Sequence, residues 1–313
     1  MDYVKKIGIL EAKDFSTTAL GILGTLGNVF LYSEDKDINN FVKDKDILFV
    51  RLKHKIDVEL INNAAKLKYI CSPTTGLNHI DEVNGVKIIS LKGEDKFLED
   101  IRATSEHVIG LHLALLRNYK YAFLDVDNSD WNRDAFKGRE IFNSTVGIIG
   151  YGRIGKLLKK YYDSFGANVI AYDIKEEIDD DVVFTHTIED LIRQSDVVIL
   201  CANYSPGYNA FFDRDYFDLL RGKYFINASR GELINEPDLI SFIISSDFKG
   251  VALDVISNET DILNSEVMNI LRIIKGKNVI VTPHIGGATF DSMSRTEIFI
   301  AEKLYQHIKR IGI

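Results

Sequence analysis

The sequence has few of the residues and segments that mark several classes of protein. Two cysteines and four prolines among 313 residues indicate neither a disulfide framework nor a proline-rich linker. No apolar run approaches the ~20 residues that span a bilayer, and the N-terminal segment lacks the apolar core and cleavage site of a signal peptide. The formal charge of −8 argues against a general affinity for nucleic acid or anionic membranes. These absences predict a cytoplasmic globular protein.

The residues that are present fit this class. A length of 313 residues suggests about two domains, and a hydrophobic content of 46% can fill a substantial core. Cys71 and Cys201 both lie in or beside apolar runs, so buried free thiols explain them better than a zinc site does. We therefore expect no metal ion.

Short apolar runs typical of β-strands alternate with helical patterns along the first part of the chain. These runs occupy residues 7–10, 47–50, 68–71 and 87–90. Residues 58–67 are amphipathic, and residues 99–116 have apolar side chains at the spacing of one long helix. Strands that alternate with helices favour a parallel sheet covered on both faces.

The second part of the chain repeats the pattern. Its apolar runs occupy residues 146–149, 168–172, 196–200, 224–227, 250–254 and 278–281. About six such strands are enough for a complete dinucleotide-binding sheet. The stretch from 292 to 311 is amphipathic and predicts a helix.

A glycine-rich turn, VGIIGYGRIG at residues 146–155, joins an apolar strand to a helix. In such a turn the first glycine allows the tight bend, the second lets the backbone approach a pyrophosphate, and the third lets helix and strand pack closely. The new helix also points unpaired N–H groups at the phosphates. The predicted cofactor contacts are Gly150, Gly152, Arg153, Ile154 and Gly155.

An acidic residue follows the turn at the distance expected for a nucleotide site. Asp173 ends the next apolar strand, about 20 residues beyond the glycines, where a carboxylate commonly binds the adenosine ribose hydroxyls. Because this carboxylate would repel a 2′-phosphate, we expect NAD rather than NADP. A glycine turn between ordinary core elements is the alternative interpretation.

The turn lies near the middle of the chain, which suggests an inserted domain. We expect the NAD-binding domain to occupy residues 100–288, and residues 1–99 and 289–313 to pack together as a discontinuous substrate-binding domain. Ligands of open α/β sheets bind beyond the carboxyl ends of the strands, so we expect the active site in a cleft between the domains.

Polar residues follow three successive strands of the second part. Arg230, in NASRG, offers a planar fork that can hold a carboxylate, and Glu259 follows the strand 250–254. His284 lies between a proline and two glycines and can exchange a proton near neutral pH. A carboxylate beside an imidazole favours its protonated form. Together the three residues make a workable site for an anionic substrate.

Each residue also has a simpler interpretation when it is taken alone. Arg230 could be a solvated surface side chain, Glu259 a charged loop residue, and His284 a structural histidine. A short-chain dehydrogenase with a Tyr-xxx-Lys pair is another possible class, because Tyr32–Lys36 and Tyr305–Lys309 both have that spacing. The first pair precedes the glycine turn and the second lies in the terminal amphipathic stretch, which makes this class a weak alternative.

The chain resembles the D-isomer-specific 2-hydroxyacid dehydrogenase family. VGIIGYGRIG, INASRGELIN, GVALDV and VTPHIGG match that family's motifs in the family's order, and the resemblance covers nearly the whole chain. It implies two doubly wound parallel-sheet α/β domains, a Rossmann-type NAD domain inserted into a discontinuous flavodoxin-like substrate domain. It places the catalytic arginine at Arg230, the glutamate at Glu259 and the acid–base histidine at His284.

The resemblance also assigns further cofactor and substrate contacts. Those for NAD include Ala228, Asp254, His284 and Gly286. Residues 72–81 fall on the family's substrate loop, so Thr74, Thr75 and Gly76 are the expected carboxylate-binding residues. Leu77 and Asn78 replace the valine and aspartate that are common there, and Thr260 stands where a proline often follows the glutamate, which leaves the substrate open.

The basic run 51–55 and the aromatic stretch 118–134 complete the expectations. Arg51 follows a strand and occupies the place of an arginine that binds phosphate in phosphoglycerate dehydrogenases, although a solvated charge run is the simpler interpretation. Residues 118–134 match the family's dimer-forming region and imply a homodimer.

The predicted activity is NAD-dependent interconversion of a D-2-hydroxy acid, such as phosphoglycerate or glycerate, and its 2-keto acid. The alternative is an NAD-responsive non-enzymatic co-regulator of the same fold.

Overall fold

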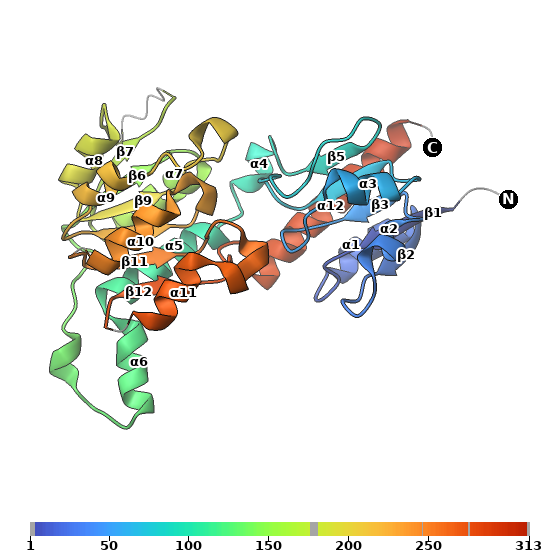
Figure 1. Ribbon diagram of the computed structural model, residues 1–313. Helices are drawn as coiled ribbons and strands as arrows, with labels where there is room; N and C mark the ends of the chain where they lie inside the picture. Colours follow the sequence, from blue (N-terminus) through green and yellow to red (C-terminus); the bar gives the residue numbers. More distant parts are fainter. Residues whose placement is uncertain (1–3, 176–180, 246, 275, 312–313) are drawn as a thin grey trace. The chain divides into compact units, whose positions relative to one another are not determined.

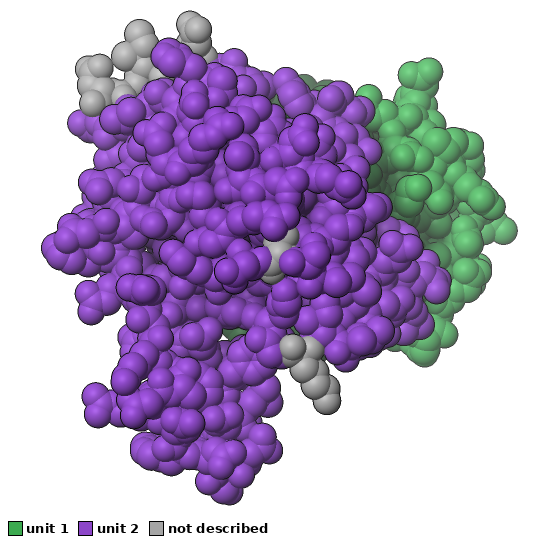
Figure 2. Space-filling view, turned by 60° about the vertical axis from the view of Figure 1, so that its left-hand side comes forward, with its two compact units in different colours: residues 1–101, 288–313 green, residues 102–287 purple. Residues whose placement is uncertain are grey.

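The computed structural model describes residues 4–311 with the exception of 176–180, 246 and 275, and the chain divides into two compact units (Figure 1, Figure 2). Unit 1 consists of Met1–Ile101 and Ala288–Ile313, and unit 2 consists of Arg102–Gly287. The expected boundaries, 99/100 and 288/289, fall within two residues of these. Unit 1 is discontinuous because the C-terminal segment packs with the N-terminal strands.

The sheet of unit 1 has five parallel strands. Their order is β2-β1-β3-β4-β5, which is the flavodoxin-like order 2-1-3-4-5. The strands are β1 (Lys5–Ile9), β2 (Gly27–Leu31), β3 (Ile47–Phe49), β4 (Tyr69–Ser72) and β5 (Lys87–Ser90). All four pairs between neighbouring strands are parallel, so the carboxyl ends of β3 and β4 lie at the same edge.

Helices cover both faces of this sheet because alternate strand residues point to opposite sides. One face holds Ile7, Ile9 and Phe49 against α1 (Thr17–Gly24), α4 (Asp95–Leu98) and α12 (Phe290–Arg310). The other face holds Leu48, Val50 and Ile70 against α2 (Ile38–Val42) and α3 (Val58–Asn63). The C-terminal helix α12 therefore contributes directly to the core of unit 1.

The sheet of unit 2 has seven strands in the order β12-β11-β10-β9-β6-β7-β8. They are β6 (Thr145–Ile149), β7 (Asn168–Tyr172), β8 (Val183–Phe184), β9 (Val197–Leu200), β10 (Tyr224–Asn227), β11 (Gly250–Leu253) and β12 (Val279–Val281). Counted from β6, this is the dinucleotide-binding order 3-2-1-4-5-6 with one further strand. The order reverses next to β6, which is where the glycine turn begins.

Two hydrophobic clusters lie on the two faces of the unit 2 sheet. Val146, Ile148 and other strand residues pack against α5 (Ala103–Leu116) and α7 (Arg153–Ser164). The opposite face packs against α8 (Ile188–Gln194), α9 (Arg214–Leu219), α10 (Glu236–Ser245) and α11 (Glu266–Ile273). The two sheets with helices on both faces confirm the expected fold class.

Several elements differ from the sequence-based expectation. The helix expected over 99–116 begins only at Ala103, because Ile101 is buried in the core of unit 1 and the chain passes between the units at residues 101 and 102. The amphipathic stretch 58–67 is helical only to Asn63. The edge strands β2 and β8 were not expected. Residues 27–31 have little buried surface and residues 183–184 form a two-residue strand, so neither has a strong apolar signal.

Helix α6 (Tyr119–Asp127) and the 3-10 helix η1 (Arg133–Phe136) project from the rest of unit 2 (Figure 1). None of the residues of α6 is buried, and the side chains of Phe123 and Trp131 are 64% and 87% exposed. Two bonds tie α6 to the strand β12 and the turn before it, from Lys120 Nζ to the Val279 carbonyl and from Tyr121 Oη to the Lys277 carbonyl. The projecting segment is thus anchored at its start and exposes apolar surface.

The structure also bears on the two cysteines and on membrane-spanning helices. Cys71 and Cys201 are both free thiols, and burial raises the pKa of Cys201 to about 12. Within the described part of the chain, no helix is both long enough and apolar enough to cross a membrane.

Candidate active site

The glycine turn after β6 has the backbone geometry that the motif predicts. Gly150 has φ +93°, and a Cβ there would lie 2.6 Å from Cα of Ala202. A Cβ on Gly155 would lie 2.8 Å from the Gly150 carbonyl oxygen, so the helix α7 packs directly on the turn. Both positions exclude a side chain for steric reasons.

The residues of this turn fit a dinucleotide. A Cβ on Gly152 would meet no atom within 4 Å, so the backbone there faces open space. No side chain caps the N-terminus of α7, which leaves its first N–H groups and the positive end of the helix dipole for an anion. Arg153 begins this helix, and Ile154 packs against the core beneath it.

Asp173 lies at the carboxyl end of β7 and is bonded to the glycine turn. Its Oδ2 accepts the backbone N–H of Tyr151 at 2.7 Å, and its Oδ1 accepts that of Lys175 at 2.9 Å. The carboxylate is thereby fixed beside the residues that would hold the pyrophosphate. A negative charge in this place suits ribose hydroxyl groups and opposes a 2′-phosphate.

Arg230 is positioned by a short hydrogen-bonded turn after β10. The Asn227 side chain accepts the Ser229 backbone N–H at 3.0 Å and donates to the Arg230 carbonyl at 3.1 Å. Arg230 Nη1 donates to the Ser229 carbonyl at 2.7 Å. Burial lowers the pKa of the guanidinium from its usual value, while the Glu232 and Glu259 carboxylates oppose the shift. The guanidinium forms no ion pair within 4 Å among the described residues, so its charge is available to an anionic ligand.

Gly231 brings the arginine turn against the segment that leads to Glu259. A Cβ at this position would lie 2.0 Å from the carbonyl carbon of Ile256 and 2.3 Å from the nitrogen of Ser257. No side chain fits such a gap, and two backbone segments touch there. Glu259 begins the 3-10 helix η4 (Glu259–Asn264) two residues beyond Ser257.

His284 lies on a constrained turn after β12. Its φ is +52°, an unusual conformation for a residue with a side chain, and its N–H donates to the Asp254 carbonyl at 2.8 Å. Its Nδ1 is 2.6 Å from Glu259 Oε2. Because an ionised carboxylate can only accept, Nδ1 carries the hydrogen of this bond and Nε2 is left to exchange a proton. The two side chains are 21% and 34% exposed, so a ligand can reach them.

The Asp254 carboxylate holds the two residues that follow His284. It accepts the backbone N–H of Ile285 at 2.9 Å and that of Gly286 at 2.8 Å. Burial would raise the pKa of Asp254, but hydrogen bonds from His107, Thr282 and these amides bring it below its ordinary value. Asp254 is therefore an anion that fixes the histidine turn.

His107, on α5, was missed in the sequence analysis. Its Nε2 lies 3.1 Å from both Asp254 Oδ1 and Thr282 Oγ1. The available signal was its helical position, since His107 lies four residues from Ala103 and from Leu111, both of which are buried. That spacing places it on the core-facing side of the helix.

The remaining expected residues divide between the two units. In unit 2, Ala228 is buried at the end of β10 next to Ser229, whose hydroxyl donates to the Ala202 carbonyl. In unit 1, the loop after β4 contains Thr74, whose Oγ1 donates to the Gly76 carbonyl at 2.9 Å. In the described structure the amides of Thr75 and Gly76 donate no backbone hydrogen bond, so they can receive a carboxylate.

Arg51 follows β3 in unit 1, but its guanidinium is already paired. Nε and Nη2 lie 3.1 and 2.6 Å from Glu297 Oε1, on α12. The two side chains are 16% and 1% exposed. The guanidinium is therefore neither fully solvated nor without a carboxylate partner.

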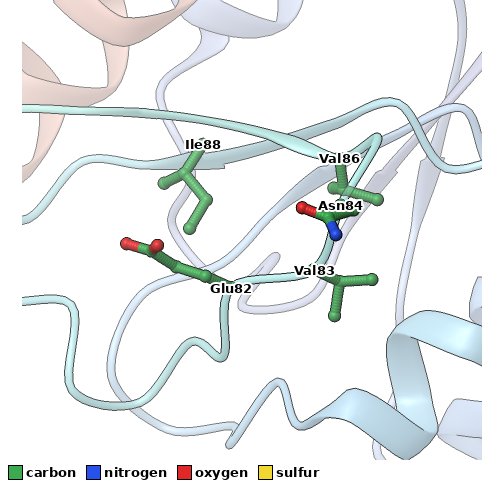
Figure 3. Close-up of a pocket in the computed structure, with 5 residues that line it drawn as sticks. All are labelled: Glu82, Val83, Asn84, Val86 and Ile88. Atoms are coloured by element: carbon green, nitrogen blue, oxygen red, sulfur yellow. The ribbon is translucent and has the colours of Figure 1, made fainter.

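Two surface pockets are lined by other residues. One, of about 460 Å³, lies in unit 1 along the single segment 82–88 and is lined by Glu82, Val83, Asn84, Val86 and Ile88 (Figure 3). The other, of about 390 Å³, lies in unit 2 between α5 and α7 and is lined by Arg102, Glu106, Ile109, Tyr161, Ser164 and Phe165. Neither contains a predicted catalytic residue.

The two Tyr-xxx-Lys pairs belong to unit 1, whereas the glycine turn belongs to unit 2. Tyr32 Oη donates to the Lys36 carbonyl at 2.7 Å, and Lys309 Nζ lies 4.4 Å from the ring centre of Tyr305. Both are local contacts within one segment. They do not form the acid–base pair of a short-chain dehydrogenase.

The strand order of the sheet and the glycine turn without a side-chain cap are those of a dinucleotide-binding domain. Residues 109–286, more than half of the chain, match the family model described as D-isomer specific 2-hydroxyacid dehydrogenase, NAD binding domain. The chain belongs to this family, and it is an NAD-dependent enzyme.

Individual relatives agree with this assignment. The chain is 28% identical to a hydroxypyruvate reductase of Thermotoga maritima over 288 residues, which cover 90% of this chain and 89% of the relative. It is 28% identical to a D-3-phosphoglycerate dehydrogenase of Methanocaldococcus jannaschii over 309 residues, 95% of this chain but only 57% of the relative. The fold matches that of Aquifex aeolicus D-lactate dehydrogenase complexed with NAD and lactic acid, with a TM-score of 0.81, 24% identity and coverage of 98% and 95%.

Proposed function

We propose that the chain interconverts a D-2-hydroxy acid and its 2-keto acid, with His284 and Glu259 as the acid–base pair and Arg230 as the substrate anchor. The observation that carries this proposal is the 2.6 Å contact between His284 Nδ1 and Glu259 Oε2, on the same unit as the glycine turn. It leaves Nε2 of the imidazole to serve the substrate.

In the direction of reduction, Arg230 binds the substrate carboxylate through its planar fork and polarises the neighbouring carbonyl. The glycine turn and Asp173 would hold NADH, which when bound would supply a hydride to C2 of the 2-keto acid. His284 donates the Nε2 proton to the carbonyl oxygen as that atom gains negative charge. The hydroxy acid thus receives one hydride and one proton, and the imidazole becomes neutral.

Glu259 has two roles in this proposal. Its carboxylate stabilises the charged imidazolium before reduction and fixes the orientation of the ring through Nδ1. In the direction of oxidation, His284 must begin neutral so that Nε2 can take the hydroxyl proton. Such acid–base assistance typically supplies about 10²–10⁴-fold in rate.

The other predicted contacts complete the proposed site. For the cofactor we assign the glycine turn, Asp173, and the residues at the later strand ends, namely Ala228, Asp254 and Gly286. For the substrate we assign the amides of Thr75 and Gly76 beside the Thr74 side chain. The printed activities of the two relatives, on hydroxypyruvate and on D-3-phosphoglycerate, make short 2-keto acids with and without phosphate the first candidates.

We further propose that the chain forms a homodimer through α6 and the segment after it. The support is the exposed apolar surface of this projecting segment, which includes Phe123, Leu124, Val126 and Trp131. Such a surface is typical of protein–protein contacts.

The comparisons give no support to the non-enzymatic co-regulator.

The proposal is tested by measuring NADH oxidation by the purified chain with a panel of 2-keto acids. The panel contains glyoxylate, pyruvate, hydroxypyruvate, its 3-phosphate and bulkier analogues. Turnover with at least one of them, and a product of D configuration, is the expected result. Failure to oxidise NADH with any member of the panel, while NADH still binds, would refute the assigned activity.

A further inference from the structure

The basic loop after β3 is electrically compensated by carboxylates of unit 1. Glu297 lies on α12, and its second oxygen, Oε2, accepts the Ser16 backbone N–H at 2.7 Å. Arg51 Nη2 also donates to the Met293 carbonyl at 3.3 Å. The carboxylate of Glu297 is therefore fixed from both sides, and the arginine is held against it.

Two further carboxylates contact the loop, one at its backbone and one at the exposed side chain of Lys53. Glu11 accepts the backbone N–H groups of Arg51 and Lys53 at 2.7 and 2.9 Å. The side chain of Lys53 forms an ion pair with Glu34. The side chains of Arg51 and Lys53 are thus each paired with one carboxylate, and Glu11 adds a third negative charge at the backbone of the loop. Lys55 is exposed, so water and salt screen its charge.

We propose that the Arg51–Glu297 ion pair excludes substrates with a distal phosphate, so that the enzyme takes a 2-keto acid whose distal group is uncharged. This inference rests on the proposed function, which assigns substrate contacts to the loop after β4. The carboxyl end of β3, where Arg51 follows, lies at the same edge of the sheet as that loop. A phosphate carries between one and two negative charges near neutral pH, and the compensated loop has no excess positive charge to attract it. To bind Arg51 strongly, the phosphate would have to displace Glu297 and leave a buried carboxylate without its partner.

An uncharged distal group meets no such penalty. A hydroxymethyl or methyl group neither competes for the guanidinium nor is repelled by Glu297. Discrimination therefore arises from one buried carboxylate on the C-terminal helix, and Glu297 is a specificity-determining residue. Its effect is electrostatic, so it should respond to removal of charge at constant shape.

The experiment compares NADH oxidation with hydroxypyruvate and with hydroxypyruvate 3-phosphate, which differ only in the distal phosphate. For the wild-type chain we expect kcat/KM to favour hydroxypyruvate by about 10²-fold or more. Glu297→Gln keeps the size of the side chain and leaves the charge of Arg51 without its partner. The ratio of kcat/KM for hydroxypyruvate to kcat/KM for its 3-phosphate should therefore fall by about 10-fold. The double variant Arg51→Gln/Glu297→Gln removes both charges and should return the ratio towards the wild-type value.

Glu302→Gln is the matched control, because Glu302 is an exposed glutamate on the same helix and its loss changes the net charge equally. It should leave the ratio unchanged. Equal kcat/KM values of the wild type for both substrates would overturn the inference and leave the proposed function intact, whereas no oxidation with any 2-keto acid would overturn both. If Glu297→Gln folds and its ratio of the two kcat/KM values equals that of the wild type, the inference is also contradicted. If this variant folds poorly, the ratio measured for the wild type decides the test.

Discussion

Arg230 and Arg51 occupy similar positions in the two sheets, but their guanidinium groups have different partners. Each follows a parallel strand at its carboxyl end, and each is partly buried. Arg230 Nη1 donates to a backbone carbonyl, and burial lowers the pKa of the guanidinium although the Glu232 and Glu259 carboxylates oppose the shift. Arg51 is paired with Glu297, a carboxylate that is 1% exposed.

The comparison shows that the position of an arginine at a strand end does not fix its role. A guanidinium that the fold leaves unpaired and partly desolvated can bind an anionic ligand strongly. A guanidinium that neutralises a buried carboxylate stabilises the fold instead. We therefore propose that the two arginines have different tasks, with Arg230 in unit 2 as a substrate anchor and Arg51 in unit 1 as the partner of a buried carboxylate.

The largest effect is expected from Arg230→Gln. Loss of the charge at the substrate carboxylate should lower kcat/KM for a 2-keto acid by about 10³-fold, as the loss of a preorganised donor commonly does. The free energy of unfolding should stay nearly unchanged, because among the described residues no carboxylate lies within ion-pair distance of Arg230. Steady-state kinetics and urea denaturation measure these two quantities. A variant that loses stability but keeps its activity would contradict the proposed difference between Arg230 and Arg51.

Arg51→Gln should show the reverse pattern. It leaves Glu297 buried without its cation, so we expect the free energy of unfolding to fall by about 3 kcal/mol. For hydroxypyruvate, kcat/KM of the fraction that remains folded should change by less than about 10-fold, because an uncharged distal group does not need this arginine. The comparison fails if urea denaturation shows no loss of stability, or if activity with hydroxypyruvate disappears.

A smaller effect extends the comparison to two histidines of unit 2. His112 is 1% exposed and bonded to Tyr162 Oη at 2.9 Å, and burial lowers its pKa to about 4, whereas His284 is accessible and paired with a carboxylate. Because the unfolded imidazole titrates near 6.5 and binds protons more readily, stability should rise with pH between about 4 and 6.5. From pH 7 to pH 5 this group should remove about 2 kcal/mol from the free energy of unfolding.

His112→Asn cannot titrate and supplies the control. The variant should lose less stability than the wild type between pH 7 and pH 5, measured by urea denaturation at each pH. Parallel curves for the two proteins would show that His112 is charged or solvated in the folded state.

Sequence reasoning reached the parts of this molecule that depend on local patterns. The nucleotide turn was predicted from an apolar strand, the glycines at 150, 152 and 155, and the helix that follows. This was possible because the role of each glycine depends on the local backbone geometry. The mid-chain position of that turn predicted a discontinuous first domain. Both results follow from short-range geometry and from the rules of parallel sheets.

The long-range charge pairs were beyond this reasoning. Arg51 and Glu297 are 246 positions apart, and the basic run 51–55 looked like an excess of charge when it was considered alone. One signal was present, since Glu297 lies three, four and seven residues before the buried Ile300, Ala301 and Leu304. A carboxylate on the apolar face of a helix requires a buried cation, but the sequence does not say which one.

The proton transfer by His284 is the central claim, and one measurement tests it most directly. NADH binding and the turnover of a 2-keto acid are measured on the same preparation of His284→Gln. We predict that the Kd for NADH changes little, while turnover falls by about 10²–10⁴-fold. Turnover at the wild-type rate in this variant would contradict the account.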